Sequence, residues 1–167
     1  MNGKWVAGGL VLTGVIGGIV LYWLQVYAYY DDVAFTPGAE ISLVPVTGGA
    51  PQPLLVDAIQ GIDGSNSPLR FRACFITSVS LATLTETYVI QPAAIPLTAP
   101  RWFECFDAAA IGAALESGEA VAFLSQPEVS RGIDRVVAVF GDGRAFAWHQ
   151  PNATLPSISL PSISLKD

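Results

Sequence analysis

Residues 5–30 contain no charged side chain, and this uncharged run limits what the chain can fold into more than any other feature does. A helix of about 20 apolar residues spans the hydrocarbon core of a bilayer. The run exceeds that length and is bounded by Lys4 on one side and by Asp31 and Asp32 on the other. We therefore expect one transmembrane helix over residues 5–30, preceded by a short end at residues 1–4.

The groups that flank this run indicate its orientation. Lys4 and the terminal amine are the cations nearest the first end, whereas two aspartates follow the second. Because cationic flanks stay in the cytoplasm, we expect a cytoplasmic N-terminus and an exported (periplasmic) remainder in a bacterial inner membrane. Four of the five tyrosines lie between Tyr22 and Tyr30, as aromatic rings do at the headgroup level. A cleaved secretory signal is the alternative, but its apolar core is usually only about 7 to 15 residues long.

Small residues follow one face of the expected helix. Gly14 and Gly18 are four residues apart, and Ala7 and Val11 continue the same face. Small side chains let two helix backbones approach closely in a membrane. We expect this face to contact an integral membrane protein, although glycine is also common in helices that meet only lipid.

The exported part is acidic. All 14 acidic residues and seven of the eight basic residues follow Tyr30, which gives that part a net charge of −7. Such a surface repels nucleic acid phosphates and anionic headgroups, so we expect no nucleic acid partner. The acidic balance serves solubility or attracts a basic soluble protein.

The two cysteines, Cys74 and Cys105, both lie in the exported part. In an oxidising compartment an even number of cysteines indicates a disulfide, which here would stabilise the fold by about 3 to 4 kcal/mol. A redox pair is usually spaced C-x-x-C, and a copper site would need more ligands than His149 and the initiating Met1. We expect a structural disulfide, no metal and no cofactor.

Short strands with one or two helices indicate an α+β domain, mainly antiparallel, over residues 31–152. Asp107 is an expected helix N-cap and Gly118 the helix end, with Ile111, Ala114 and Leu115 on one face. We expect strands at 39–46, 69–76 and 119–124, and a hairpin with strands 135–140 and 144–149. A loop is expected at 61–68, and the segment 78–87 is either a helix or a strand. Residues 153–167, which repeat LPSIS, are expected to form an extended tail.

Several segments resemble a family of small membrane-anchored proteins from alphaproteobacteria, a domain of unknown function. The resemblance rests on FRACF at 71–75, LTETY at 84–88, PLTAP at 96–100, WFECFDA at 102–108, GIDRVVAVF at 132–140 and WHQ at 148–150. It covers residues 1 to about 152. It implies a Gram-negative inner-membrane setting and brings no assigned catalytic residues.

Few residues point to chemistry. A catalytic arrangement would have to use His149 with a carboxylate, and a lone histidine beside Trp148 is more often packed than catalytic. Arg70 and Arg72 form a candidate anion clamp, but the favoured interpretation is that they pair with local carboxylates on the solvated face of their strand. An aromatic contact surface is the other candidate, comprising Trp102, Phe103, Trp148 and His149, with burial in the core as its alternative.

Three classes of function follow from these features. The chain is expected to be a non-enzymatic accessory or assembly subunit of a larger inner-membrane complex, of respiratory or photosynthetic type. A membrane-tethered periplasmic enzyme using His149 and a carboxylate is the first alternative. An anchored periplasmic binding or sensory module is the second.

Overall fold

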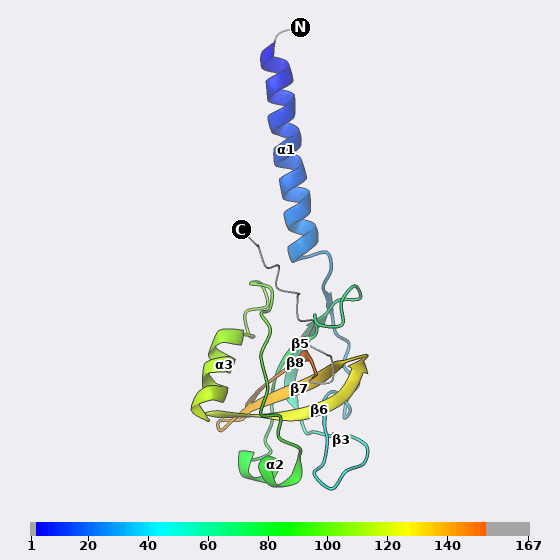
Figure 1. Ribbon diagram of the computed structural model, residues 1–167, viewed down its shortest axis with the longest axis vertical. Helices are drawn as coiled ribbons and strands as arrows, with labels where there is room; N and C mark the ends of the chain where they lie inside the picture. The colour runs from blue at the N-terminus through cyan, green and yellow to red at the C-terminus, as the bar shows by residue number, and fades with distance from the viewer. Residues whose placement is uncertain (1–2, 153–167) are drawn as a thin grey trace, which may run out of the picture.

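The computed structural model describes residues 3–152, in which one long helix projects from a mainly antiparallel β domain (Figure 1). This arrangement confirms the predicted α+β class. In chain order the elements are α1 Gly3–Val26, β1 Asp31–Asp32, β2 Ser42–Leu43, β3 Gln52–Pro53, β4 Asp57–Asp63, β5 Arg72–Ile76, α2 Leu81–Thr87, α3 Ala108–Ser117, β6 Ala120–Ser130, β7 Ile133–Phe140 and β8 Arg144–Pro151.

Six strands form one sheet in the order β1-β4-β5-β8-β7-β6, and every neighbouring pair is antiparallel. A second, two-stranded sheet pairs β2 with β3. The central hairpin β7–β8 turns at residues 141–143, where Gly143 adopts a φ of +91° that favours glycine. The outer edge of β6 is covered by irregular segments, since Val44 donates to Leu124 and Gln91 donates to Ala122.

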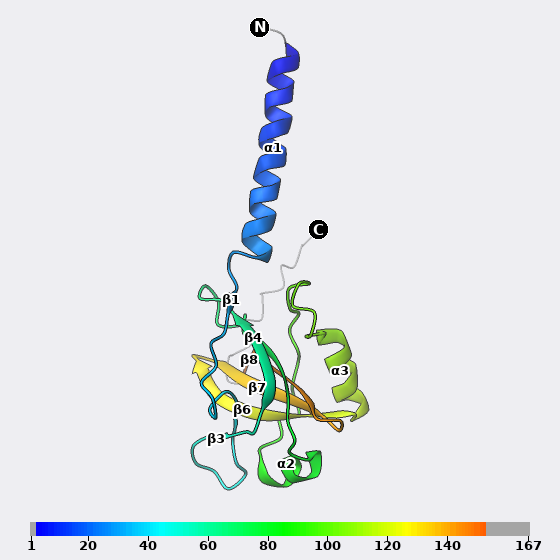
Figure 2. The same cartoon turned by 180° about the vertical axis from the view of Figure 1, so that it is seen from behind.

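Both faces of the large sheet are buried. Helix α3 packs on one face, where Ile111 and Ala114 meet Val136 and Trp148. The β2–β3 pair and α2 cover the other face, where Leu43 and Leu84 pack against residues such as Phe71 and Val137. Seen from behind, α3 lies beside the strands and α2 below them (Figure 2). Little of the sheet is therefore left open to solvent.

Helix α1 contains no buried residue. It is 24 residues long and apolar enough to cross a membrane, which makes it a candidate membrane span near the N-terminus. The helix ends at Val26, four residues before the predicted end at residue 30. Residues 27–30 turn instead, with Tyr30 N donating to Tyr27 O, and lead directly into β1.

Local signals placed several elements correctly. Asp107 caps α3 by accepting from Ala109 N and Ala110 N, and Gly118 ends it with a φ of +77°. The ambiguous segment at 78–87 contains α2, which Ser80 caps. Three expected bounds are wrong. Residues 61–63 belong to β4 rather than to a loop, only residues 42–43 of the expected strand at 39–46 pair as a strand, and the strand expected at 69–76 begins at Arg72. The tail at 153–167 lies outside the described residues.

Candidate functional site

The small-residue face of α1 is open along its length. Ala7, Val11, Gly14 and Gly18 are all exposed. A Cβ atom built at Gly14 or Gly18 would have nothing within 4 Å outside the helix. The residues that the sequence assigned to helix packing are thus accessible to another helix or to lipid.

The end of α1 meets the domain through three aromatic side chains, Tyr27, Tyr30 and Trp102, which we call the aromatic collar. The indole Nε1 of Trp102 donates to the carbonyl oxygen of Val26 at 2.8 Å, so a domain side chain satisfies one of the last carbonyls of the helix. The Trp102 ring stacks on Tyr27 at 6.1 Å between centroids and meets Tyr30 edge-on at 5.9 Å. Trp102, expected in a contact surface, therefore makes a contact within the chain.

A second contact attaches the segment after α1 to the domain. The guanidinium of Arg70 donates to Tyr29 O at 3.4 Å and lies 5.3 Å and 4.9 Å from the ring centroids of Tyr29 and Tyr30. Gly64 packs against this contact, because a Cβ atom at Gly64 would meet Tyr29 O and the Arg70 side chain. Arg70 thus binds aromatic rings and a carbonyl rather than forming an anion clamp with Arg72.

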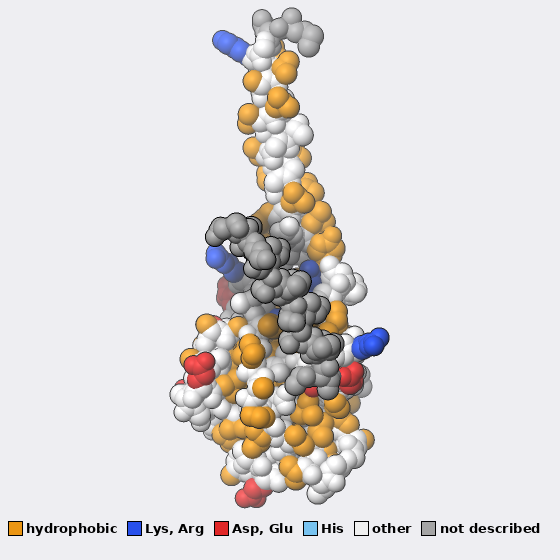
Figure 3. All heavy atoms as spheres, viewed as in Figure 1, with side chains coloured by type: hydrophobic (Ala, Val, Ile, Leu, Met, Phe, Trp, Pro, Cys, Tyr) orange, Lys and Arg blue, Asp and Glu red, His pale blue; other side chains and the backbone are white. Residues whose placement is uncertain are grey.

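A hollow of about 550 Å³ opens beside the collar, between the last turns of α1 and residues 98–102. Its lining includes Tyr22, Gln25 and Val26 from the helix, and Pro100 and Arg101 from the loop. Figures 1 and 2 both show this loop reaching toward the base of α1, and cationic side chains are visible near that base in Figure 3.

A second hollow, of about 420 Å³, lies against the same collar. Its lining consists of the three collar residues with Asp31 and Asp32 from β1. The two hollows therefore share the collar and differ in charge, since Arg101 belongs to one and the two aspartates to the other.

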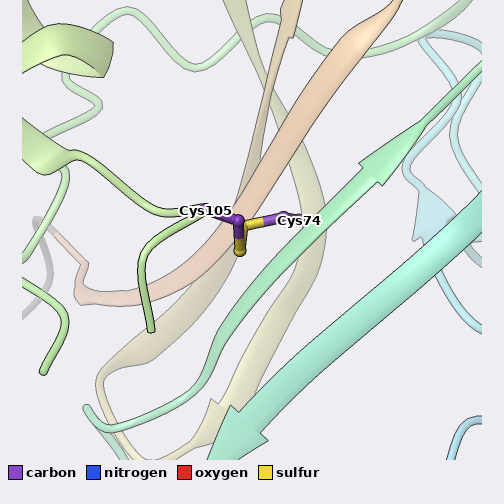
Figure 4. The surroundings of a disulfide bond; sticks show 2 residues. All are labelled: Cys74 and Cys105. Atoms are coloured by element: carbon purple, nitrogen blue, oxygen red, sulfur yellow. A yellow bond between two sulfur atoms is a disulfide. The ribbon is translucent and has the colours of Figure 1, made fainter. Parts of the chain in front are cut away.

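The disulfide joins Cys74 in β5 to Cys105 in the loop before α3, as the sequence predicts (Figure 4). Its Cα atoms are 6.3 Å apart, within the usual range for a disulfide. Cys105 is three residues after Trp102, so the bond holds the loop that carries the collar tryptophan against the central sheet.

His149 is buried and both of its ring nitrogens have partners. Nδ1 lies 2.6 Å from the carbonyl oxygen of Pro68, and Nε2 accepts from Arg135 Nε at 3.0 Å. A carbonyl only accepts, so we assign the ring proton to Nδ1 and a neutral imidazole. Burial and the nearby charge of Arg135 lower the pKa of His149 to about 4.

Phe71 lies under this pair. The His149 ring stacks on Phe71 at 4.7 Å, and the Arg135 guanidinium carbon lies 4.1 Å from the same ring centroid. Burial also lowers the pKa of Arg135, an effect that the charge of Asp63 opposes. The arrangement uses His149 to hold an arginine and a loop carbonyl and leaves neither nitrogen free for proton transfer.

Arg72 is buried, which corrects the expectation of a solvated strand face. Its guanidinium donates to four backbone carbonyls at 2.6 to 3.1 Å, those of Leu69, Phe71, Leu97 and Thr98. Burial lowers its pKa to about 10. The loop before α3 covers this side of β5, so Arg72 ties that loop to the strand.

Two further members of the expected contact surface are also buried. Trp148 is fully buried and donates from its indole to Gln150 Oε1, and Phe103 is 8% exposed. Of the four aromatic candidates, only Trp102 remains partly exposed.

Within residues 3–152 no group of three or more histidine, cysteine, aspartate or glutamate side chains is arranged to hold a metal ion.

Two residues of these sites, Arg135 and Arg101, were not predicted from the sequence. The position of Arg135 could have been predicted, because a hairpin with a three-residue turn at 141–143 places residue 135 opposite residue 149. The structure has this pairing of Arg135 with His149. The position of Arg101 could not, since it depends on how the loop folds against α1.

A family model matches residues 41–157, most of the β domain and five residues beyond it. The model describes a family of unknown function, DUF6446. The chain belongs to DUF6446. No curated protein and no solved structure matches the chain.

The region matched by the family covers a defined part of this chain. It begins at Ile41, so it contains the disulfide, the Arg135–His149 pair and Trp102 but not α1. The expected resemblance over residues 1 to 152 is therefore supported for the domain only. The helix-proximal half of the collar, Tyr27 and Tyr30, lies outside the match.

Proposed function

We propose that this DUF6446 protein is a membrane-tethered accessory or assembly subunit that docks on an integral membrane protein through α1. The observation that carries the proposal is the open face of α1: Gly14 and Gly18 have nothing near them, and the domain contacts the helix at its last turn. Apolar helices with such faces associate closely in membranes. We place the protein in a bacterial inner membrane, of alphaproteobacterial type, with the N-terminus cytoplasmic and the domain periplasmic.

The charge distribution supports this orientation. Lys4 precedes the helix, and Asp31 and Asp32 follow it. The disulfide supports an oxidising compartment for the domain. A partner complex of respiratory or photosynthetic type is the class we propose.

The tethered-enzyme alternative has less support. General base catalysis by His149 would need a ring nitrogen within reach of a substrate proton. Both nitrogens of His149 have partners inside the fold, and the ring is buried. A binding role is better supported, by the two hollows at the collar.

Gentle detergent extraction of the tagged full chain at native expression, followed by mass spectrometry, tests the proposal. A Gly14→Leu plus Gly18→Leu variant fills the open face. Gly9→Leu is the matched control, since Gly9 lies about 140° around the helix from Gly14. We expect stoichiometric recovery with one membrane complex, lost in the double variant and kept in the control. Recovery alone, or as a homodimer, would overturn the proposal.

A further inference from the structure

We propose that the two hollows at the aromatic collar together bind the headgroup of a zwitterionic phospholipid, with its phosphate at Arg101 and its ammonium on the side of Asp31 and Asp32. This inference rests on the proposed membrane anchoring. It is carried by the two adjoining hollows and by the polar groups and charges that line them.

The first hollow offers hydrogen-bond donors that the fold does not use. Arg101 is exposed, and among the described residues neither its guanidinium nor the Gln25 amide has a hydrogen-bond partner. A guanidinium binds phosphate oxygens through two parallel N–H groups, which suits this position to a phosphate. Val26 and Pro100 supply apolar surface beside it.

The second hollow offers the complementary chemistry. Asp31 and Asp32 supply negative charge, and the rings of Tyr27, Tyr30 and Trp102 line the hollow beside them, with Arg70 already over one face of Tyr30. Aromatic faces attract ammonium groups, as carboxylates do. An anionic headgroup would meet these aspartates unfavourably, whereas a headgroup with both a phosphate and an ammonium brings a group of opposite charge to each hollow.

The position of the collar selects a lipid over a soluble zwitterion. The collar adjoins the last turn of the candidate membrane span, where tyrosine and tryptophan rings lie at headgroup level. Both hollows open at this level, so a lipid in the adjoining leaflet would reach them without leaving the bilayer.

Lipid retention by the purified full chain tests the inference. The protein is equilibrated in mixed micelles with equal amounts of phosphatidylethanolamine and phosphatidylglycerol, and bound lipid is counted by native mass spectrometry. We expect phosphatidylethanolamine to be preferred. Arg101→Gln should lower its retention about three- to tenfold. Asp31→Asn plus Asp32→Asn should shift the preference about two- to fivefold toward phosphatidylglycerol.

Arg131→Gln is the matched control, because Arg131 is an exposed arginine in the β6–β7 turn and lines neither hollow. It should leave retention unchanged. Equal retention by Arg101→Gln and the parent protein would overturn the inference, as would displacement of the lipid by glycerophosphoethanolamine or inorganic phosphate at matched concentration.

Flotation with phosphatidylethanolamine vesicles separates this inference from the proposed anchoring. If the chain floats and Arg101→Gln leaves its lipid retention unchanged, the protein has the membrane anchor but no headgroup site. If the chain does not float, it has neither the anchor nor the headgroup site. Loss of the partner complex in the Gly14 and Gly18 variant, measured separately, does not bear on the headgroup.

Discussion

His149 illustrates how a chemically versatile residue serves packing in this protein. Its neutral ring joins the carbonyl of Pro68 to Arg135 and lies on Phe71. Protonation would place a second positive charge against Arg135 and convert Nε2 from an acceptor to a donor. The hydrogen bond between Arg135 and His149 cannot survive that change, because both groups would then only donate.

The fold should therefore lose stability in acid through His149. Its pKa falls from 6.5 unfolded to about 4 folded, so the unfolded state binds the proton first as the pH drops. The contribution of neutral His149 to the free energy of unfolding is complete above pH 6.5. It is lost as the pH falls from 6.5 to about 4, which lowers the free energy of unfolding by up to about 3 kcal/mol. Urea unfolding of the full chain across this range measures it.

The His149→Gln variant isolates the effect from carboxylates that also titrate in acid. Removing the imidazole should flatten the dependence of the free energy of unfolding on pH between 6.5 and 4. Parallel curves for the variant and the parent protein would contradict the assignment.

Two glycines should respond oppositely to the same substitution. In Gly64→Ala the new methyl would meet Tyr29 O and lie 2.5 Å from Arg70 Cδ, which should lower the free energy of unfolding by about 1 to 3 kcal/mol. Gly112 lies within α3 with nothing within 4 Å, so Gly112→Ala should raise it by about 0.5 to 1 kcal/mol. Chemical denaturation of both variants checks the signs.

At the scale of elements, the sequence predicts the helices and strands whose ends are fixed by residues close by in the chain. The β7–β8 hairpin follows from the glycines at its turn, and α3 follows from a cap at Asp107 and a stop at Gly118. The burial of Arg72 does not follow, because its four carbonyl partners include Leu97 and Thr98, about 25 residues away. A strand pattern of alternate residues predicts one solvated face, whereas β5 lies in mid-sheet under a loop.

The same limit applies to the candidate site. The aromatic residues of the collar are evident in the sequence, but their contacts join segments 76 residues apart. Nothing local indicates that Trp102 turns toward Val26 while Trp148 turns into the core.

The disulfide is the element-scale feature with the largest expected effect. Replacing Cys74 and Cys105 together by alanine opens a loop of about 31 residues, which should lower the free energy of unfolding by about 3 to 4 kcal/mol. Denaturant titration of the double variant against the oxidised protein measures the loss. Since the bond holds the Trp102 loop, the collar should loosen as well, seen as increased tryptophan exposure to acrylamide. A stability difference below about 1 kcal/mol would contradict the structural role.

For the whole molecule, the relation between helix and domain depends on three attachments. Strand β1 joins the sheet five residues after α1 ends, Trp102 binds the last helical turn, and Arg70 binds the segment between them. These contacts favour a domain that is held against the last turn of α1 rather than swinging on a linker.

Trp102 should govern that attachment more than it governs stability. Trp102→Ala removes both the hydrogen bond to Val26 O and the stacking on Tyr27, whereas Trp102→Phe removes the hydrogen bond and keeps an aromatic ring. Proteolysis between residues 27 and 40 should accelerate about tenfold in the alanine variant and less in the phenylalanine variant. Trp23→Ala is the control, because Trp23 is exposed on α1. Equal cleavage of all three would contradict the role of the collar.

The bond between Trp102 and Val26 also has a consequence for biogenesis. The ribosome completes α1 long before it reaches Trp102, since 76 residues separate the donor from the acceptor. The Val26 carbonyl therefore has no indole donor when α1 is first synthesised, and it receives one only after the later segment has folded. Formation of the helix and closure of the collar are thus successive events, and the collar marks the completion of the second.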